Sequence, residues 1–161
     1  MANEEHPDGL NTRIPRWVPY TALILSVAVA WFWAGEGGIR FATEADHTDQ
    51  RQVMRGKQIY EQHCARCHGV QLEGEPNWKT AKADGTLPAP PHDASGHTWH
   101  HTDKQNFAYT KYGAAGIGAP ASFKSGMPAF EGVLSDAQIW DALAFIESTW
   151  PDDIHQRRPE P

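Results

Sequence analysis

The two cysteines of the chain, Cys64 and Cys67, lie three positions apart, and His68 directly follows the second, in the run CARCHG. Closely spaced thiols serve disulfide exchange, zinc binding or covalent attachment of haem. A thioredoxin-like dithiol lies between a strand and a helix, whereas a helical pattern precedes this motif. A structural zinc site needs four ligands, and the sequence offers neither a second cysteine pair nor a suitably spaced histidine pair. The order C-x-x-C-H is typical of c-type haem attachment.

Covalent haem attachment accounts for the spacing of these residues. One turn of chain can present Cys64 and Cys67 to the two vinyl groups of the porphyrin, while His68 reaches the iron from one face. The porphyrin then becomes part of the core, which helps a loop-rich chain without a convincing strand pattern to bury enough apolar surface. The sequence therefore predicts one haem c, held by two thioether bonds and ligated by His68.

The second axial position of the iron is predicted to belong to Met127. This residue follows His68 by 59 positions and lies in a Gly- and Pro-containing loop, SGMPAF, before the last predicted helix. Met54 lies only ten positions before Cys64, which is too close for it to reach the opposite face. The alternatives are that Met127 only fills a gap in the core, or that a histidine takes its place as ligand.

Two amphipathic helices flank these candidate ligands. The first runs into the cysteine motif, and residues spaced by three and four mark its apolar face: Val53, Gly56, Ile59 and Tyr60. The last begins with an S-x-x-Q capping box at Ser135 and Gln138 and is ended by Pro151. Its apolar stripe consists of Ile139, Trp140, Leu143 and Ile146.

The stretch between these helices is predicted to be mostly loop. Residues 69–97 are rich in Gly, Pro and Asp, and residues 114–130 are again punctuated by Gly and Pro. One short helix is expected between them, with Thr102 or Asp103 as its N-cap and Gly113 as its end.

Residues 17–35 are predicted to form a single transmembrane helix. The run contains no charged side chain, has tryptophans at both ends, and with about 18 apolar residues just suffices to cross a hydrocarbon core of roughly 30 Å. A signal peptide cleaved after AVA, residues 28–30, is the alternative. Arg13 and Arg16 on the N-terminal flank favour a cytoplasmic N-terminus, which places the main domain in the periplasm of a bacterium.

The other segments follow from composition. Residues 1–16 read as a polar leader, 36–47 as a linker, 48–151 as the haem domain and 152–161 as a polar tail. The net charge of -6 argues against a nucleic-acid partner. No nucleophile–base pair or acid–base dyad stands out, so we expect neither a small-molecule substrate nor enzyme activity from the chain by itself.

Residues 48–151 resemble a class I cytochrome c, on the evidence of the leading helix, the C-x-x-C-H-G motif, the Met-Pro loop and the final amphipathic helix. The resemblance implies an all-α fold in which the first and last helices cross, with Gly56 and Tyr60 against the face of Trp140 and Leu143. It also implies that a proline carbonyl orients the iron-ligating histidine, and Pro76 is the candidate. With the predicted anchor, the whole chain resembles membrane-attached bacterial cytochromes c.

Residues 84–112 depart from a minimal member of that class because they are longer and richer in histidine. The segment contains His92, His97, His100 and His101. Imidazoles bind copper and zinc, but no carboxylate or thiol pattern completes a ligand set. The histidines therefore either bind a second metal or cap turns and hydrogen-bond the haem propionates.

The expected function is one-electron transfer, because iron ligated by histidine and methionine has no open position for oxygen or substrate. The excess of acidic side chains favours a partner with a basic docking patch. A short linker favours redox partners in or at the same bacterial cytoplasmic membrane. The alternatives are a tightly bound haem subunit of a membrane dehydrogenase or oxidase, and a gas or redox sensor with a vacant iron site.

Overall fold

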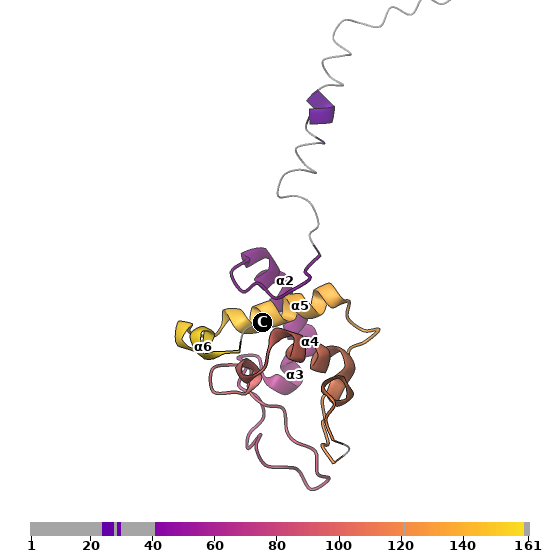
Figure 1. The fold of residues 1–161 in the computed structure, drawn as a ribbon, viewed down its shortest axis with the longest axis vertical. Helices are drawn as coiled ribbons and strands as arrows, with labels where there is room; N and C mark the ends of the chain where they lie inside the picture. The colour runs from indigo at the N-terminus through magenta and orange to yellow at the C-terminus, as the bar shows by residue number, and fades with distance from the viewer. Residues whose placement is uncertain (1–23, 28, 30–40, 121, 160–161) are drawn as a thin grey trace, which may run out of the picture. The chain divides into compact units, whose positions relative to one another are not determined.

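The computed structural model describes residues 24–27, 29, 41–120 and 122–159 (Figure 1). The chain forms two units, residues 1–40 and residues 41–161, and the second contains the cysteine motif. Of the predicted anchor, the described residues are helical, and the remainder of the anchor lies outside the described residues, as does the leader. Within the described ranges, no helix is long and apolar enough to cross a membrane.

The second unit is helical, as the sequence predicted. Its elements are α2 (Gln50–His63), α3 (Ala65–His68), η1 (Thr98–His100), α4 (Asp103–Tyr112), η2 (Gly113–Ile117), α5 (Asp136–Ser148) and α6 (Asp152–Arg157). In the described part of the chain, the β-type pairing is a single isolated parallel bridge between Leu87 and Ser125. Long loops connect α3 to α4 and η2 to α5 (Figure 1).

The helix boundaries follow the local signals in the sequence. The Thr102 hydroxyl accepts a hydrogen bond from the backbone N–H of Gln105, whose side chain accepts one from the Thr102 N–H, so the start of α4 is a complete capping box. Ser135 and Gln138 form the same reciprocal pair at the start of α5. Gly113 ends α4 with a φ of 67°. The loop predicted after Gly113 differs in one respect, because it begins with the short 3-10 helix η2.

Helix α2 packs against α5, as the predicted crossing requires. A Cβ atom on Gly56 would lie 1.8 Å from the carbonyl oxygen of Asp141, so only glycine allows this approach. The Tyr60 ring lies 5.3 Å from that of Phe145. Of the predicted contact face, Leu143 shares the buried core with Tyr60, whereas the Trp140 ring stacks on Phe107 of α4, with 4.3 Å between the centroids.

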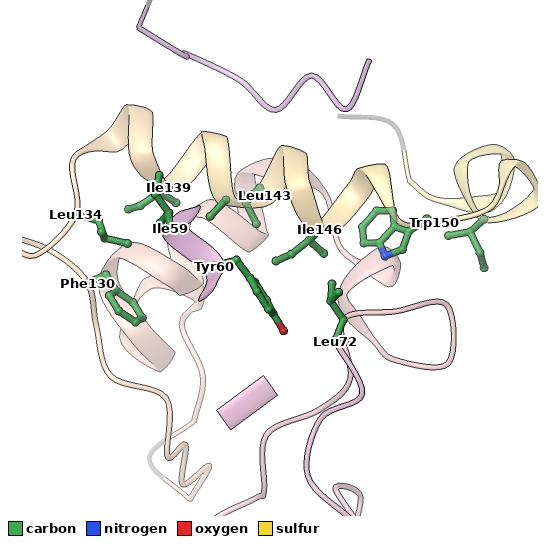
Figure 2. Close-up of a cluster of buried hydrophobic side chains, with 11 residues drawn as sticks. Ile59, Tyr60, Leu72, Phe130, Leu134, Ile139, Leu143, Ile146 and Trp150 are labelled. Atoms are coloured by element: carbon green, nitrogen blue, oxygen red, sulfur yellow. The ribbon is translucent and has the colours of Figure 1, made fainter. Parts of the chain in front are cut away.

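The hydrophobic core lies along the inner side of α5 and extends to the loops beneath it (Figure 2). Its labelled members are Ile59, Tyr60, Leu72, Phe130, Leu134, Ile139, Leu143, Ile146 and Trp150. Burial of these side chains is the main stabilising contribution available to a domain with so little regular structure. Trp150 also donates a hydrogen bond of 2.7 Å from its indole N–H to the carbonyl oxygen of His92, which fixes one loop against the end of α5.

The segments predicted as linker and tail both contact the domain. The Gln52 side chain donates to the carbonyl oxygen of Glu44 at 2.9 Å and accepts from the Asp46 N–H at 3.0 Å, so the end of the predicted linker 36–47 is bonded to α2. The predicted polar tail 152–161 contains α6. The prediction from polar composition missed one core residue of this segment, Ile154, which is 3% exposed.

A buried ionic cluster joins this tail to two helices. The Arg158 guanidinium donates to Asp103 at the start of α4 and lies 2.9 Å from a carboxylate oxygen of Glu147 near the end of α5. It also lies 4.9 Å from the ring centre of Trp150. Glu147 is 2% exposed and Arg158 10%. Burial and the neighbouring Asp103 charge raise the pKa of Glu147 to about 8, although Arg158 acts in the opposite direction.

Replacing Glu147 with glutamine should flatten the dependence of stability on pH. The pKa of about 8 lies above the ordinary 4.5, so the folded protein retains a proton that the unfolded chain releases. The contribution of this proton is complete below about pH 4.5 and is lost as the pH rises through about 8, so the free energy of unfolding falls across that range. Urea unfolding of the native protein and of Glu147→Gln at several pH values in this range measures the difference in slope.

The exposed Glu131 provides the matched control. Glu131→Gln should keep the slope of the native protein. Both substitutions remove one carboxyl group, so the difference between their slopes measures the effect of the buried position of Glu147. Equal slopes for the native protein and Glu147→Gln would contradict a raised pKa at this position.

Candidate functional site

One turn of helix carries the three residues of the cysteine motif. Cys64 is both the C-cap of α2 and the N-cap of α3. Its backbone stays in the right-handed helical region, so the two helices follow each other directly. The N–H groups of Cys67 and His68 both donate to the carbonyl oxygen of Cys64, each at 3.0 Å. Gly69, with a φ of 81°, ends the turn directly after the histidine. The predicted placement of both thiols and the imidazole on one turn is therefore confirmed.

The two cysteines are not joined in a disulfide, and their side chains lie in different environments. Cys64 is partly buried and Cys67 is exposed. Burial, followed by the proximity of Cys67, raises the pKa of the Cys64 thiol to about 11. Dithiols that exchange disulfides use the opposite shift, because their reactive sulfur must be a thiolate near neutral pH. This environment fits a thiol that is consumed once in forming a thioether, and not a redox-cycling pair.

The ring of His68 is held in a single orientation by the carbonyl oxygen of Pro90, which lies 2.8 Å from its Nδ1 atom. A carbonyl oxygen can only accept, so Nδ1 carries the proton and the lone pair of the neutral ring lies on Nε2. His68 is 6% exposed, and this burial lowers its pKa, which keeps the ring neutral. A neutral imidazole with Nε2 available is the form that ligates iron.

The residue that orients His68 is Pro90 and not Pro76, which the sequence analysis named. Pro76 is exposed at the beginning of a long excursion of the chain. That excursion returns to the domain at Ala89, and this return brings the next residue, Pro90, against the histidine. A proline carbonyl does perform the expected role, but it comes from the far end of the loop.

Glu75 fixes the point at which this loop closes. Its backbone N–H donates to the carbonyl oxygen of Ala89 at 2.8 Å, and its carboxylate accepts from the N–H of Ala89 at 2.7 Å. Lys82 Nζ lies 3.1 Å from the other carboxylate oxygen. Ala89 is thus bonded on both sides immediately before Pro90. No sequence signal distinguished Glu75, because its partner lies 14 positions away and is a backbone amide.

His92 is the one of the four additional histidines that contacts His68. Their rings stack with centroids 3.9 Å apart. The Nδ1 atom of His92 is hydrogen-bonded to the hydroxyl of Thr98, and its backbone N–H donates to the carbonyl oxygen of Leu72. His92 therefore supports the orientation of the His68 ring by packing against it.

The other three histidines form a separate, looser group. The ring of His97 lies 5.2 Å from that of His100 and 4.8 Å from that of His101. Among the residues that the structure describes, no three or more His, Cys, Asp or Glu side chains are arranged to hold a metal ion. The geometry of these donors gives the hypothesis of a second metal no support.

Met127 lies in a partly buried position against the hydrophobic core. Its N–H donates to the Ser125 hydroxyl at 3.0 Å, and that hydroxyl is also hydrogen-bonded to the hydroxyl of Tyr109 at 2.7 Å. Its role as an iron ligand stays a prediction. A groove of about 270 Å³ lies between its loop and the cysteine turn, lined by Gln62, His63, Arg66, Pro128, Ala129, Phe130 and Val133.

A helical domain that presents two thiols and an oriented, neutral imidazole from one turn has the donor set of a covalent haem-binding domain. The family model for cytochrome c matches residues 53–150, which is well over half of the chain. The chain belongs to the cytochrome c family. Searches of curated proteins and of solved structures returned no significant match.

Membership of this family implies a covalently bound haem c and haem-based electron transfer. The residues fit that cofactor. Cys64 and Cys67 would supply the two sulfurs, and His68 would offer Nε2 because the Pro90 carbonyl is bonded to Nδ1. Members of the family are generally electron carriers and not enzymes.

Replacing Glu75 with alanine should raise the reduction potential of the haem-loaded protein. The change releases the N–H of Ala89 and loosens the Pro90 carbonyl, so His68 loses part of the hydrogen bond that makes its ring a stronger electron donor. Weaker donation favours the reduced iron. Potentiometric titration of the two proteins measures the shift.

Glu61→Ala is the control, since Glu61 is an exposed carboxylate on α2 that pairs only weakly with Lys57 at 3.9 Å. Its potential should stay close to that of the native protein. A Glu75→Ala protein with the native potential and a lower unfolding midpoint would show that Glu75 stabilises the loop without acting on His68.

Proposed function

We propose that the chain is a one-electron carrier with a single haem c, attached through Cys64 and Cys67 and ligated by His68 and Met127. The observation that carries the proposal is the 2.8 Å contact between Nδ1 of His68 and the carbonyl oxygen of Pro90, because His68 lies on the same turn as the two cysteines. This contact leaves Nε2 as the ligating atom. The bound haem supplies reversible one-electron chemistry at its iron.

The protein's own contribution to this chemistry is to keep the site rigid and closed. Pro90 holds the Nδ1 edge of the His68 ring, and His92 stacks on a face of that ring. Ser125, two positions before Met127, accepts a hydrogen bond from the Met127 N–H, and its hydroxyl is hydrogen-bonded to that of Tyr109 on α4. Ligands that are fixed in advance need little rearrangement when an electron arrives, and a filled coordination sphere leaves oxygen or substrate no open position.

The alternative is a haem subunit bound tightly within a membrane dehydrogenase or oxidase. Purification distinguishes the carrier from the subunit, because a subunit copurifies with its complex in fixed stoichiometry and a carrier does not. A sensor is less well supported, because it needs an iron position that is open or easily vacated.

The proposed location is the bacterial cytoplasmic membrane, with residues 17–35 as a single-pass anchor in the lipid and the haem domain on the periplasmic side. This proposal rests on the apolar sequence and its flanking arginines. Because Glu44 and Asp46 are bonded to α2, the tether can include no more than residues 36–43. So short a tether favours redox partners in or at the same membrane.

Optical spectroscopy of the membrane-extracted protein tests the proposed ligation. The native protein should give a low-spin c-type spectrum, in both oxidation states, that does not change when carbon monoxide is added to the reduced form. Met127→Ala should bind carbon monoxide and shift its spectrum, because the substitution opens one axial position. A clear carbon monoxide shift in the native protein would contradict a closed site and favour the sensor.

Alkaline extraction of membranes tests the anchor. The full chain should stay in the membrane pellet, and a chain in which a cleavable export signal replaces residues 1–40 should be released to the soluble periplasmic fraction. Release of the full chain, with a mature N-terminus just after residue 30, would show that the apolar segment is a cleaved signal peptide.

A further inference from the structure

Residues 76–88, which we call the strap, form an ordered excursion between Glu75 and Ala89. Figure 1 shows this loop extending away from the helices. Inside it, the N–H of Lys82 donates to the carbonyl oxygen of Thr86 at 2.8 Å, and the N–H of Gly85 donates back to that of Lys82 at 2.8 Å. These internal bonds make the strap a defined turn. A loop of fixed conformation can constrain the chain segments that it contacts at both of its ends.

The tip of the strap is bonded to the loop that contains Met127. The Lys124 ammonium donates to the carbonyl oxygen of Asp84 at 3.0 Å, and the N–H of Leu87 donates to the carbonyl oxygen of Lys124 at 3.3 Å. Leu87 and Ser125 form the parallel bridge. Gly85 has a φ of 85°, and a Cβ there would lie 3.3 Å from the Lys124 side chain, so the two segments are in close contact.

These contacts end two residues before Met127. Ser125, which pairs with the strap, accepts the hydrogen bond from the N–H of Met127 at 3.0 Å. The C-terminal end of the strap leads directly into Ala89, which precedes Pro90, the residue that orients His68. One segment of chain therefore joins the loop that fixes one predicted iron ligand to the loop that carries the other.

Apart from the strap, the Met127 loop is held here by the hydrogen bond between the Ser125 and Tyr109 hydroxyls and by packing of Met127 on the core. Residues 122–124 and 126 are exposed, so little burial holds this part of the loop in place. For Met127 to move away from the iron, its loop must move, and the bonds to the strap resist that movement. Removing those bonds lowers the cost of displacing Met127 and leaves the residue itself intact.

We propose that the strap is a positioning element that holds Met127 in its ligating position through Lys124 and Leu87. The proposal rests on the ligation of the iron by Met127 given above. It predicts that an external ligand competes with Met127 more successfully when the strap is detached, while the cysteine turn and His68 are unchanged.

Imidazole titration of the ferric, haem-loaded full chain tests the proposal. Displacement of Met127 is followed by loss of the charge-transfer band of methionine-ligated ferric haem. Lys124→Ala should bind imidazole about two- to fivefold more tightly than the native protein, and Leu87→Pro, which removes the backbone donor, about tenfold more tightly, as expected for the loss of one or two hydrogen bonds.

Lys79→Ala is the matched control, because Lys79 belongs to the strap and carries the same charge but lies over the ring of Trp78, on another part of the strap. It should keep the native imidazole affinity. If Lys124→Ala and Leu87→Pro both bind imidazole with the native affinity, the proposal is overturned. This holds even if the two variants unfold at a lower midpoint, because the strap would then only stabilise the fold.

The failure of the underlying ligation gives a different result. If Met127 is not a ligand, the native protein lacks the charge-transfer band and Met127→Ala binds imidazole as the native protein does, which overturns both proposals. If the band is present and Met127→Ala binds imidazole much more tightly, ligation stands, and the strap variants alone decide the second proposal.

Discussion

The geometry of the candidate site depends on one hydrogen bond, from Nδ1 of His68 to the carbonyl oxygen of Pro90. This bond determines which nitrogen carries the proton, and thereby makes Nε2 the ligating atom of a buried, neutral ring. The other features of the site serve its geometry. The close packing at Gly56 places the end of α2, Glu75 places Pro90, and His92 stacks on a face of the His68 ring.

Side-chain interactions at the periphery compensate for the shortage of regular structure. Trp150 bonds the His92 loop to the end of α5, and Arg158 joins that helix to the start of α4. A buried arginine between two carboxylates is stable only if its partners are well placed or one of them is protonated, and Glu147 fits the second description. The C-terminal segment is therefore part of the folded domain, and its loss would unpair charges in the interior.

The features that the sequence predicted correctly are local ones. Capping boxes, helix-ending glycines and the C-x-x-C-H turn each depend on residues within a few positions, so their geometry can be inferred from spacing. The choice of Pro90 over Pro76 depends on the path of a long loop, and the bond from Glu75 to a distant amide leaves no pattern. The role of Arg158 was hidden for the same reason, because a polar tail shows no sign of buried partners.

The most direct test of the account is intact mass analysis of the denatured protein before and after alkylation of free thiols. The account predicts that the mass includes one haem, that neither Cys64 nor Cys67 is alkylated, and that the haem stays on the peptide that also contains His68. A protein without the added mass, whose two cysteines are both alkylated, would contradict covalent attachment and with it the proposed role of the site.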